Sequence, residues 1–138
     1  MGAIAAASRK GSHMEKEAMR ERAAAVLFAW NSHDVERVVA CYTEDCVYSD
    51  PNTRGAVKGH EALRRYLTRL FREWGMHWSL REFFPFADGS GAAFLWDAEL
   101  TPVAGGKTTQ ISGMDLVLLR GERLSRNEVY FDRMALIR

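Results

Sequence analysis

The chain has 138 residues, and its 19 basic and 18 acidic side chains leave a formal net charge of +1. This balance argues against the strongly basic face of a nucleic-acid-binding domain, and no stretch reaches the roughly 18 consecutive apolar residues that a membrane span needs. The length is typical of a single domain.

The beginning of the chain differs in character from the rest. Residues 1–13 carry no apolar period, and the letters GSHM at residues 11–14 are typical of a cloning remnant. We therefore expect residues 1–13 to be an expression-tag remnant and residues 14–138 to form one domain.

The first half of this domain predicts three helices and a short strand. Apolar side chains at steps of three and four indicate helices over residues 15–30, 35–42 and 60–74. Asp34 is a suitable N-cap for the second helix, and Gly75 is a natural end for the third. Residues 46–48 predict a strand, and residues 50–55 predict a loop from their turn-forming side chains.

The second half changes to the two-residue period of β-strands. Four strand-like runs follow one another, separated by short glycine-containing segments that form turns. They cover residues 78–86, 91–101, 107–119 and 122–137. Helices followed by an antiparallel meander indicate an α+β domain. The period alone leaves open which face of each strand points inward, because the outer face of such a sheet is often buried in a dimer.

Four local motifs occur in a fixed order along residues 18–137. They are the helix exit WNSHD, the helix entry GHEALRRYL, the strand centre SGMD and the closing VYFD. Their order and spacing resemble the SnoaL-like (polyketide cyclase-like) branch of the nuclear transport factor 2-like superfamily, which has limonene epoxide hydrolase-like and ketosteroid isomerase-like relatives. The resemblance implies a cone of three N-terminal helices packed on a curved, mainly antiparallel mixed sheet that encloses one deep pocket.

The resemblance also implies which side chains line that pocket. Tyr48 and Asp50 match positions where such proteins have tyrosine and asparagine or aspartate, Asp97 matches a pocket aspartate, and Asp115 matches a position that points inward. The implied lining is Tyr48, Asp50, Leu95, Asp97, Glu99, Ile111, Asp115, Asn127, Val129 and Phe131. Trp30 and, at the rim, His60 are further candidates for binding a ligand, although His60 also fits an exposed first turn of the third helix.

Three positions depart from the epoxide hydrolase pattern. Leu95 stands where those enzymes have an arginine, and Val129 stands where their second catalytic aspartate lies. Asp132 belongs to the closing motif, but strand parity places it opposite the pocket. Epoxide hydrolysis by their mechanism is therefore not expected.

Several carboxylates in an apolar cone favour general acid-base catalysis. Desolvation and mutual repulsion raise the pKa of one carboxyl, so that it donates a proton while another accepts one. Asp97 is the first candidate for this role, with Asp50 or Asp115 as its partner, and Tyr48 could polarise a carbonyl or hydroxyl oxygen. Structural interpretations stay open: Asp50 as a turn acceptor, Tyr48 as a packing residue and Asp115 as a cap of an exposed strand pair.

Signatures of metals, nucleotide cofactors and disulfides are missing from the sequence. There is no HExxH, no pair of CxxC motifs and no clustered His-carboxylate spacing, and no glycine-rich nucleotide loop. We therefore expect neither a metal nor a cofactor. Cys41 and Cys46 form no disulfide framework, which favours reduced thiols and a cytoplasmic protein.

The leading interpretation is a cofactor-independent enzyme that uses aspartate acid-base chemistry to cyclise, isomerise, dehydrate or hydrolyse an apolar, oxygenated small molecule. The resemblance favours a natural-product intermediate as this molecule. The alternatives are a non-catalytic small-molecule-binding protein and a dimeric interaction module. The outer sheet face that would form the homodimer is expected to carry Phe94, Trp96, Leu100, Leu116 and Leu118.

Overall fold

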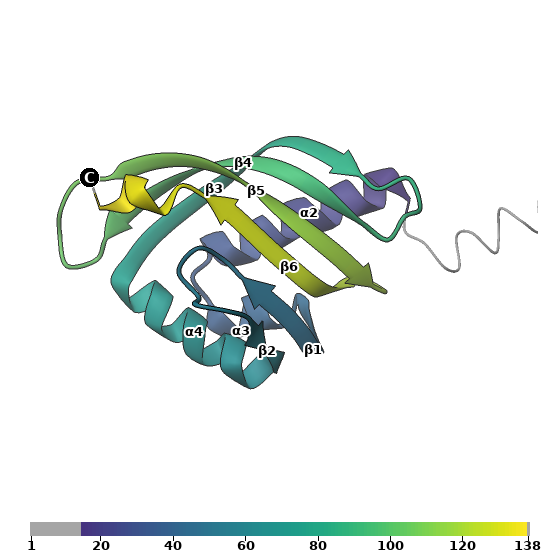
Figure 1. The fold of residues 1–138 in the computed structure, drawn as a ribbon, viewed down its shortest axis with the longest axis horizontal. Helices are drawn as coiled ribbons and strands as arrows, with labels where there is room; N and C mark the ends of the chain where they lie inside the picture. Colours follow the sequence, from purple (N-terminus) through teal and green to yellow (C-terminus); the bar gives the residue numbers. More distant parts are fainter. Residues whose placement is uncertain (1–14, 138) are drawn as a thin grey trace, which may run out of the picture.

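Three helices cover one face of a curved sheet in the computed structural model of the protein, which describes residues 15–137 (Figure 1). The helices are α2 (Lys16–Asn31), α3 (Val35–Val39) and α4 (Gly59–Glu73). The strands are β1 (Tyr42–Ser49), β2 (Val57–Lys58), β3 (Trp74–Pro85), β4 (Gly91–Pro102), β5 (Thr109–Arg120) and β6 (Arg123–Phe131), followed by a 3-10 turn, η1 (Arg133–Leu136). None of these helices has the length and apolarity to cross a membrane.

The strands form a six-stranded open sheet in the order β2-β1-β6-β5-β4-β3. β1 pairs with β6 in parallel, and the other neighbouring strands are antiparallel. The predicted α+β class, with helices packed on a mainly antiparallel mixed sheet, is confirmed. The segment expected to be a tag remnant, residues 1–13, lies outside the described residues.

The helices form where the sequence predicts them, with small shifts at their ends. The N-cap predicted at Asp34 is confirmed, because its Oδ1 accepts the backbone N–H groups of Glu36 and Arg37 at 3.1 and 3.3 Å. α3 ends at Val39 rather than at residue 42. Tyr42 already belongs to β1, because it pairs with Leu124 of β6.

Three strands differ clearly in length from their predictions, and β2 has no predicted counterpart. β1 covers Tyr42–Ser49 rather than residues 46–48. β3 begins at Trp74 directly after α4, so Gly75 lies within a strand instead of ending a helix. β6 stops at Phe131, because Asp132 Oδ1 accepts the backbone N–H of Met134 at 3.0 Å and begins η1. The final residues therefore turn away from the strand that the sequence period predicted.

Strand pairing decides which face of β4 points toward the helices. Paired side chains in an antiparallel sheet lie on the same face, and Asp97 pairs with exposed Ser112, whereas Phe94 pairs with buried Asp115. The side chains that β4 buries under the helices are Phe94, Trp96, Ala98 and Leu100. The inward orientation predicted for Leu95, Asp97 and Glu99 is wrong, and so is the outer position predicted for Phe94, Trp96 and Leu100. Side chains alternate regularly between the two faces of β4, so the sequence pattern fits either orientation. Only the pairing with β5 shows which face points toward the helices.

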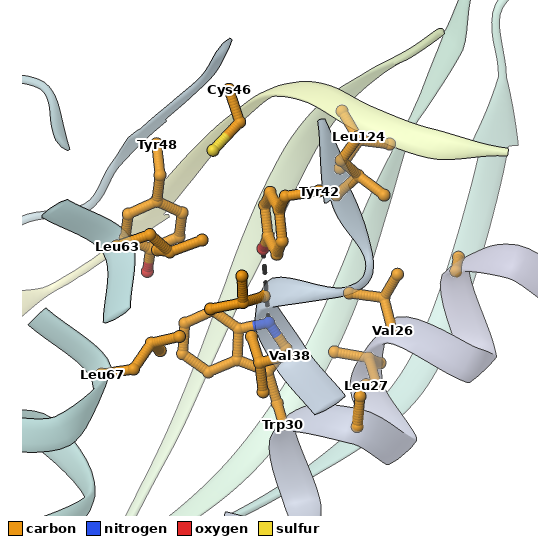
Figure 2. Packing of buried hydrophobic residues seen from close by; sticks show 14 of the residues in the cluster. Val26, Leu27, Trp30, Val38, Tyr42, Cys46, Tyr48, Leu63, Leu67 and Leu124 are labelled. Carbon is orange, nitrogen blue, oxygen red and sulfur yellow. Dashed lines mark hydrogen bonds between the residues drawn. The ribbon is translucent and has the colours of Figure 1, made fainter. Parts of the chain in front are cut away.

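The hydrophobic core lies between the helices and the inner face of the sheet. Tyr42 is fully buried at its centre, with 0% of its surface exposed, and Trp30 Nε1–H donates to the Tyr42 hydroxyl oxygen at 3.3 Å. Figure 2 shows these two side chains among apolar groups from every helix and from β6, including Val26, Leu27, Val38, Leu63, Leu67 and Leu124.

The end of α2 covers part of β3, one of the two edge strands of the sheet. Asn31 Nδ2 donates to the carbonyl of Trp78 at 2.9 Å, and its Oδ1 accepts the Trp78 N–H at 2.7 Å. His33, which has a positive φ of 57°, places Nε2 at 3.1 Å from the Met76 nitrogen and 2.9 Å from its carbonyl oxygen. Unpaired edge strands are templates for aggregation, so these contacts both protect the edge and fasten α2 to the sheet.

We expect Asn31→Ala to lower the free energy of unfolding by about 1–3 kcal/mol, because both backbone groups of Trp78 lose their partner in a half-buried position. Urea denaturation followed by circular dichroism measures this change. Arg20→Ala, on the exposed side of the same helix, is the control. A loss no larger than that of the control would show that the edge contact adds no stability.

Candidate functional site

A cavity lies between α2, α4, the inner face of the sheet and η1. Its lining is Trp30, Tyr48, Asp50, Asn52, Tyr66, Leu70, Trp74, Met76, Trp78, Trp96, Leu100, Ile111, Val129, Phe131 and Leu136. The empty space between these residues is about 440 Å³, including the part open to solvent, and the centre of a water molecule can move within about 40 Å³ of it. By this second volume, the cavity is well below the roughly 300–1,000 Å³ of usual ligand sites.

Aromatic rings form a continuous belt along this cavity. Trp30 stacks on Tyr48 with ring centres 5.7 Å apart, and it stands at 75° to Trp78 at 5.5 Å. Trp78 in turn stands at 83° to Trp96 at 6.4 Å, and Trp96 meets Phe131 at 6.2 Å. All four tryptophans of the sequence line the cavity, so the walls are large, apolar and closely packed.

A glycine makes room for one of these rings. A Cβ atom at Gly113, which pairs with Trp96 across β4 and β5, would lie 2.5 Å from the Trp96 ring and 2.5 Å from the carbonyl oxygen of Tyr130. Carbon atoms do not approach so closely without displacement, so any other residue would push the ring aside. The SGMD motif at this strand centre therefore has a packing role.

The carboxylate of Asp50 lies in the cavity wall between two tyrosines. Its Oδ2 accepts the hydroxyl hydrogens of Tyr48, at 2.7 Å, and of Tyr66. Its Oδ1 accepts the backbone N–H of Asn52 at 2.7 Å, and its own N–H donates to Thr53 Oγ1 at 3.1 Å. The turn after β1 thus fixes the carboxylate in a half-buried position where the cavity reaches it.

Both tyrosines are held in their protonated form. Burial raises the pKa of Tyr48 and of Tyr66 well above the usual range, and the negative charge of Asp50 raises both further. A protonated phenol has one hydrogen to donate. Each hydroxyl can therefore serve either the Asp50 carboxylate or an oxygen of a ligand, one at a time.

A second polar group lies behind the aromatic belt. Asp115 Oδ1 accepts the Nε1–H of Trp96 at 2.7 Å, and its Oδ2 accepts an Nδ2–H of Asn127 at 2.9 Å. Asn127 Oδ1 accepts the Tyr42 hydroxyl at 2.7 Å, and that hydroxyl oxygen accepts the Nε1–H of Trp30. Burial raises the pKa of Asp115 to about 6, while the two N–H donors act in the opposite direction. Every buried side-chain nitrogen and oxygen in residues 15–137 has a partner.

The structure places the residues expected from the resemblance at different distances from this cavity. Those in the lining are Trp30, Tyr48, Asp50, Ile111, Val129 and Phe131. Asp115 and Asn127 share the inner face but belong to the network behind the lining. His60 lies outside it, where its Nε2 donates to the backbone carbonyl of Tyr42 at 2.8 Å and fastens the start of α4 to β1.

The three predicted residues of β4 lie on the outer face of the sheet. Asp97 Oδ1 accepts the Ser112 hydroxyl at 2.6 Å and lies 3.6 Å from Arg81 Nε. Leu95 and Glu99 share that face. The charge of Asp97 is therefore paired at the surface, on the opposite side of the sheet from the cavity.

Tyr66 is not among the predicted site residues. It lies on α4 in the same stripe as Leu63, Leu67 and Leu70, and these three leucines fit the inward face of the predicted helix. Because residues three and four apart share a helix face, this spacing is a signal that places Tyr66 inside. Trp74 follows Leu70 by four residues, so the same spacing places it inside, although in the structure it is the first residue of β3.

Thiols and metal-ligating clusters do not add to the site. Cys41 is half-buried and Cys46 is buried, and both are free thiols. In the part of the chain that the structure describes, no group of three or more His, Cys, Asp or Glu side chains is arranged to hold a metal ion.

Comparisons with known proteins agree with the resemblance seen in the sequence. The family model described as SnoaL-like domain matches residues 23–127. A ketosteroid isomerase-like protein from Erwinia carotovora atroseptica is 26% identical with a TM-score of 0.69, and the match covers 86% of this chain and 98% of that one.

Two further solved structures are similar in fold. The epoxide hydrolase/cyclase-like enzyme SalBIII, described in pyran ring formation in the polyether salinomycin, is 20% identical with a TM-score of 0.78, covering 88% of this chain and 95% of that one. An LEH-like epoxide hydrolase from M. tuberculosis is 21% identical with a TM-score of 0.71, covering 88% and 86%. No curated protein sequence matches the chain.

The buried carboxyl of Asp115 makes stability depend on pH in a defined direction. Its pKa of about 6 in the folded protein lies above the ordinary value of 3.8, so the folded state binds this proton more tightly than the unfolded chain. The free energy of unfolding contributed by this group therefore falls as the pH rises from about 4 to about 6, by about 3 kcal/mol in total. Asp115→Asn removes the titration, and urea denaturation at several pH values measures both proteins. We expect the difference in unfolding free energy to move in favour of the variant across this window, and a constant difference would contradict the raised pKa.

Proposed function

Because this chain belongs to the SnoaL-like domain family, we propose that it is a cofactor-independent enzyme that acts on a small, apolar, oxygenated molecule by acid-base chemistry. Asp50 is the acid-base residue, and Tyr48 and Tyr66 bind the substrate oxygen. The observation that supports this most directly is the contact of both tyrosine hydroxyls with one oxygen of Asp50 at the cavity wall. A proton acceptor beside hydrogen-bond donors is what cyclisation, isomerisation, dehydration and hydrolysis require.

The tyrosine hydroxyls couple substrate binding to the base. A hydroxyl that turns to donate to a substrate oxygen no longer donates to Asp50, because it has one hydrogen. The carboxylate oxygen then regains a lone pair directed at the cavity and can accept a proton from the substrate. The same tyrosine stabilises the negative charge that develops on the substrate oxygen. Asp50 returns the proton to another atom of the substrate, which balances an isomerisation or a cyclisation.

The two other candidate aspartates have no direct part in this proposal. Asp115 does not line the cavity, and both of its oxygens are occupied by N–H donors. We assign it to positioning, since it holds the indole of Trp96 in the cavity wall. Asp97 is directed away from the cavity and is paired at the outer surface.

A binding protein without chemistry is the second candidate. The observation in its favour is that Asp50 already has three hydrogen-bond donors from its own chain, Tyr48, Tyr66 and Asn52. Such a carboxylate could recognise a hydroxylated ligand without accepting its proton. The two candidates differ in whether a bound ligand leaves the cavity chemically unchanged.

We also propose that the protein forms a homodimer through the outer face of the sheet. Leu95, Met114 and Leu116 are half-buried there, and Phe84 and Tyr130 are 52% and 53% exposed. A second copy would cover this apolar surface. We expect size-exclusion chromatography with light scattering to give a dimer mass, and Leu116→Glu to give a monomer. A wild-type monomer at every concentration tested would contradict the proposal.

The acid-base proposal is tested by proton exchange with a panel of enolisable cyclic ketones in deuterated water. We expect the protein to introduce deuterium next to the carbonyl, detected by NMR, and Asp50→Asn to slow this exchange by about 100-fold or more, the usual effect of a general base. Asp97→Asn is the matched comparison, because it makes the same change on the other side of the sheet. Loss of exchange in Asp97→Asn but not in Asp50→Asn would overturn the assignment, and unchanged ligands throughout would favour the binding protein.

A further inference from the structure

In the part of the chain that the structure describes, the lining of the cavity contains a negatively charged side chain but no positively charged one. Among the described residues that form it, Asp50 alone carries a formal charge. Arg133 lies at the edge, where its Nε donates to Asn52 Oδ1 at 3.0 Å, but it is exposed and outside the lining. The cavity therefore holds one negative charge in apolar surroundings, where an opposite charge is attracted more strongly than in water.

The aromatic belt forms a corner next to this carboxylate. Trp30 stacks on Tyr48, which donates to Asp50, and Trp78 stands nearly perpendicular to both Trp30 and Trp96. In an edge-to-face contact, one ring turns its flat side toward its neighbour. Ring faces carry the negative part of the aromatic quadrupole. The rings and the carboxylate therefore favour the same kind of ligand.

We propose that the ligand of this cavity is a small organic cation. Its ammonium or quaternary ammonium group rests against Trp30 and half-buried Trp78. Its oxygen-bearing end meets Tyr48 and Asp50. The inference rests on the proposed function in using the same cavity as the ligand site, and it narrows the substrate to a small one whose apolar, oxygenated skeleton also carries a cationic nitrogen.

Other ligand classes fit the same walls less well. An anion would be repelled by Asp50 and by the ring faces, with no cation in the lining to receive it. A neutral apolar ligand would gain from burial but would leave the charge of Asp50 without a counterpart. The limited volume of the cavity favours a ligand with few heavy atoms.

The direct test compares choline with 3,3-dimethylbutan-1-ol, in which a carbon replaces the charged nitrogen at the same shape. Since all four tryptophans line the cavity, intrinsic tryptophan fluorescence reports binding without a label. We expect choline to bind about tenfold more tightly than its neutral isostere, with tetramethylammonium as a second, smaller cation. Equal or tighter binding of the isostere overturns the inference, and so does the absence of any fluorescence change with both cations at millimolar concentration.

Two variants assign the preference to the cavity. Asp50→Asn keeps the shape of the side chain and removes its charge, so we expect the preference for choline over the isostere to fall severalfold, while the part that comes from the tryptophan rings remains. Glu61→Gln removes a charge from the exposed start of α4 and should leave the preference intact. An equal loss of preference in both variants would show general attraction by surface charge and would overturn the inference.

The outcome for the ligand is independent of the outcome for the reaction. A preference for the cation without any chemical change supports this inference and contradicts the proposed catalysis. Proton exchange without a preference for the cation supports the catalysis and overturns this inference.

Discussion

A chain of hydrogen bonds across the sheet is the interaction on which the rest of the structure depends. It takes one side chain from each of five neighbouring elements: Trp96 from β4, Asp115 from β5, Asn127 from β6, Tyr42 from β1 and Trp30 from α2. Buried polar groups are costly unless each has a partner, and here each has one. Because the two ends of the chain are the indoles of two cavity tryptophans, the network that fastens the elements together also fixes the walls of the site.

The sequence predicts those features that depend on local physics. The strand that ends near Tyr48 and the turn that begins at Asp50 follow from local sequence, and this turn fixes the carboxylate. Their position at a pocket is implied by the family resemblance. The helical spacing of Leu63, Tyr66 and Leu70 likewise predicts that Tyr66 points inward, toward the same side as Tyr48. The orientation of β4 does not follow from local sequence. Either of its two sets of alternating side chains could face the helices, and a shift of the pairing by one residue exchanges them. Only the pairing of Phe94 with Asp115 resolves this, and that pairing is not local.

The three candidate aspartates end in three environments, which changes the chemistry that the site can support. A pair of carboxylates sharing one pocket would have divided a proton between them. Instead, one carboxylate faces the cavity with two phenols, one is buried with two N–H donors, and one is paired with a guanidinium group at the surface. The acid-base group that we propose for the cavity is therefore a carboxylate flanked by phenols, and each phenol can donate its hydrogen either to the carboxylate or to a ligand.

The parallel pairing of β1 with β6 also has a consequence for the order in which the protein folds. Tyr42 and Asn127 are bonded across 85 positions of the chain, and contacts this distant form slowly, because a long loop must close before they stabilise anything. The helices and the β3–β6 meander can each form from nearby contacts, since Arg120 and Arg123 pair across the tight turn between β5 and β6, whereas the pairing of β1 with β6 joins distant parts of the chain. We therefore expect the cavity to be completed late in folding, when β1 pairs with β6, and the apolar faces on either side of it to stay exposed to water and to other chains until that step.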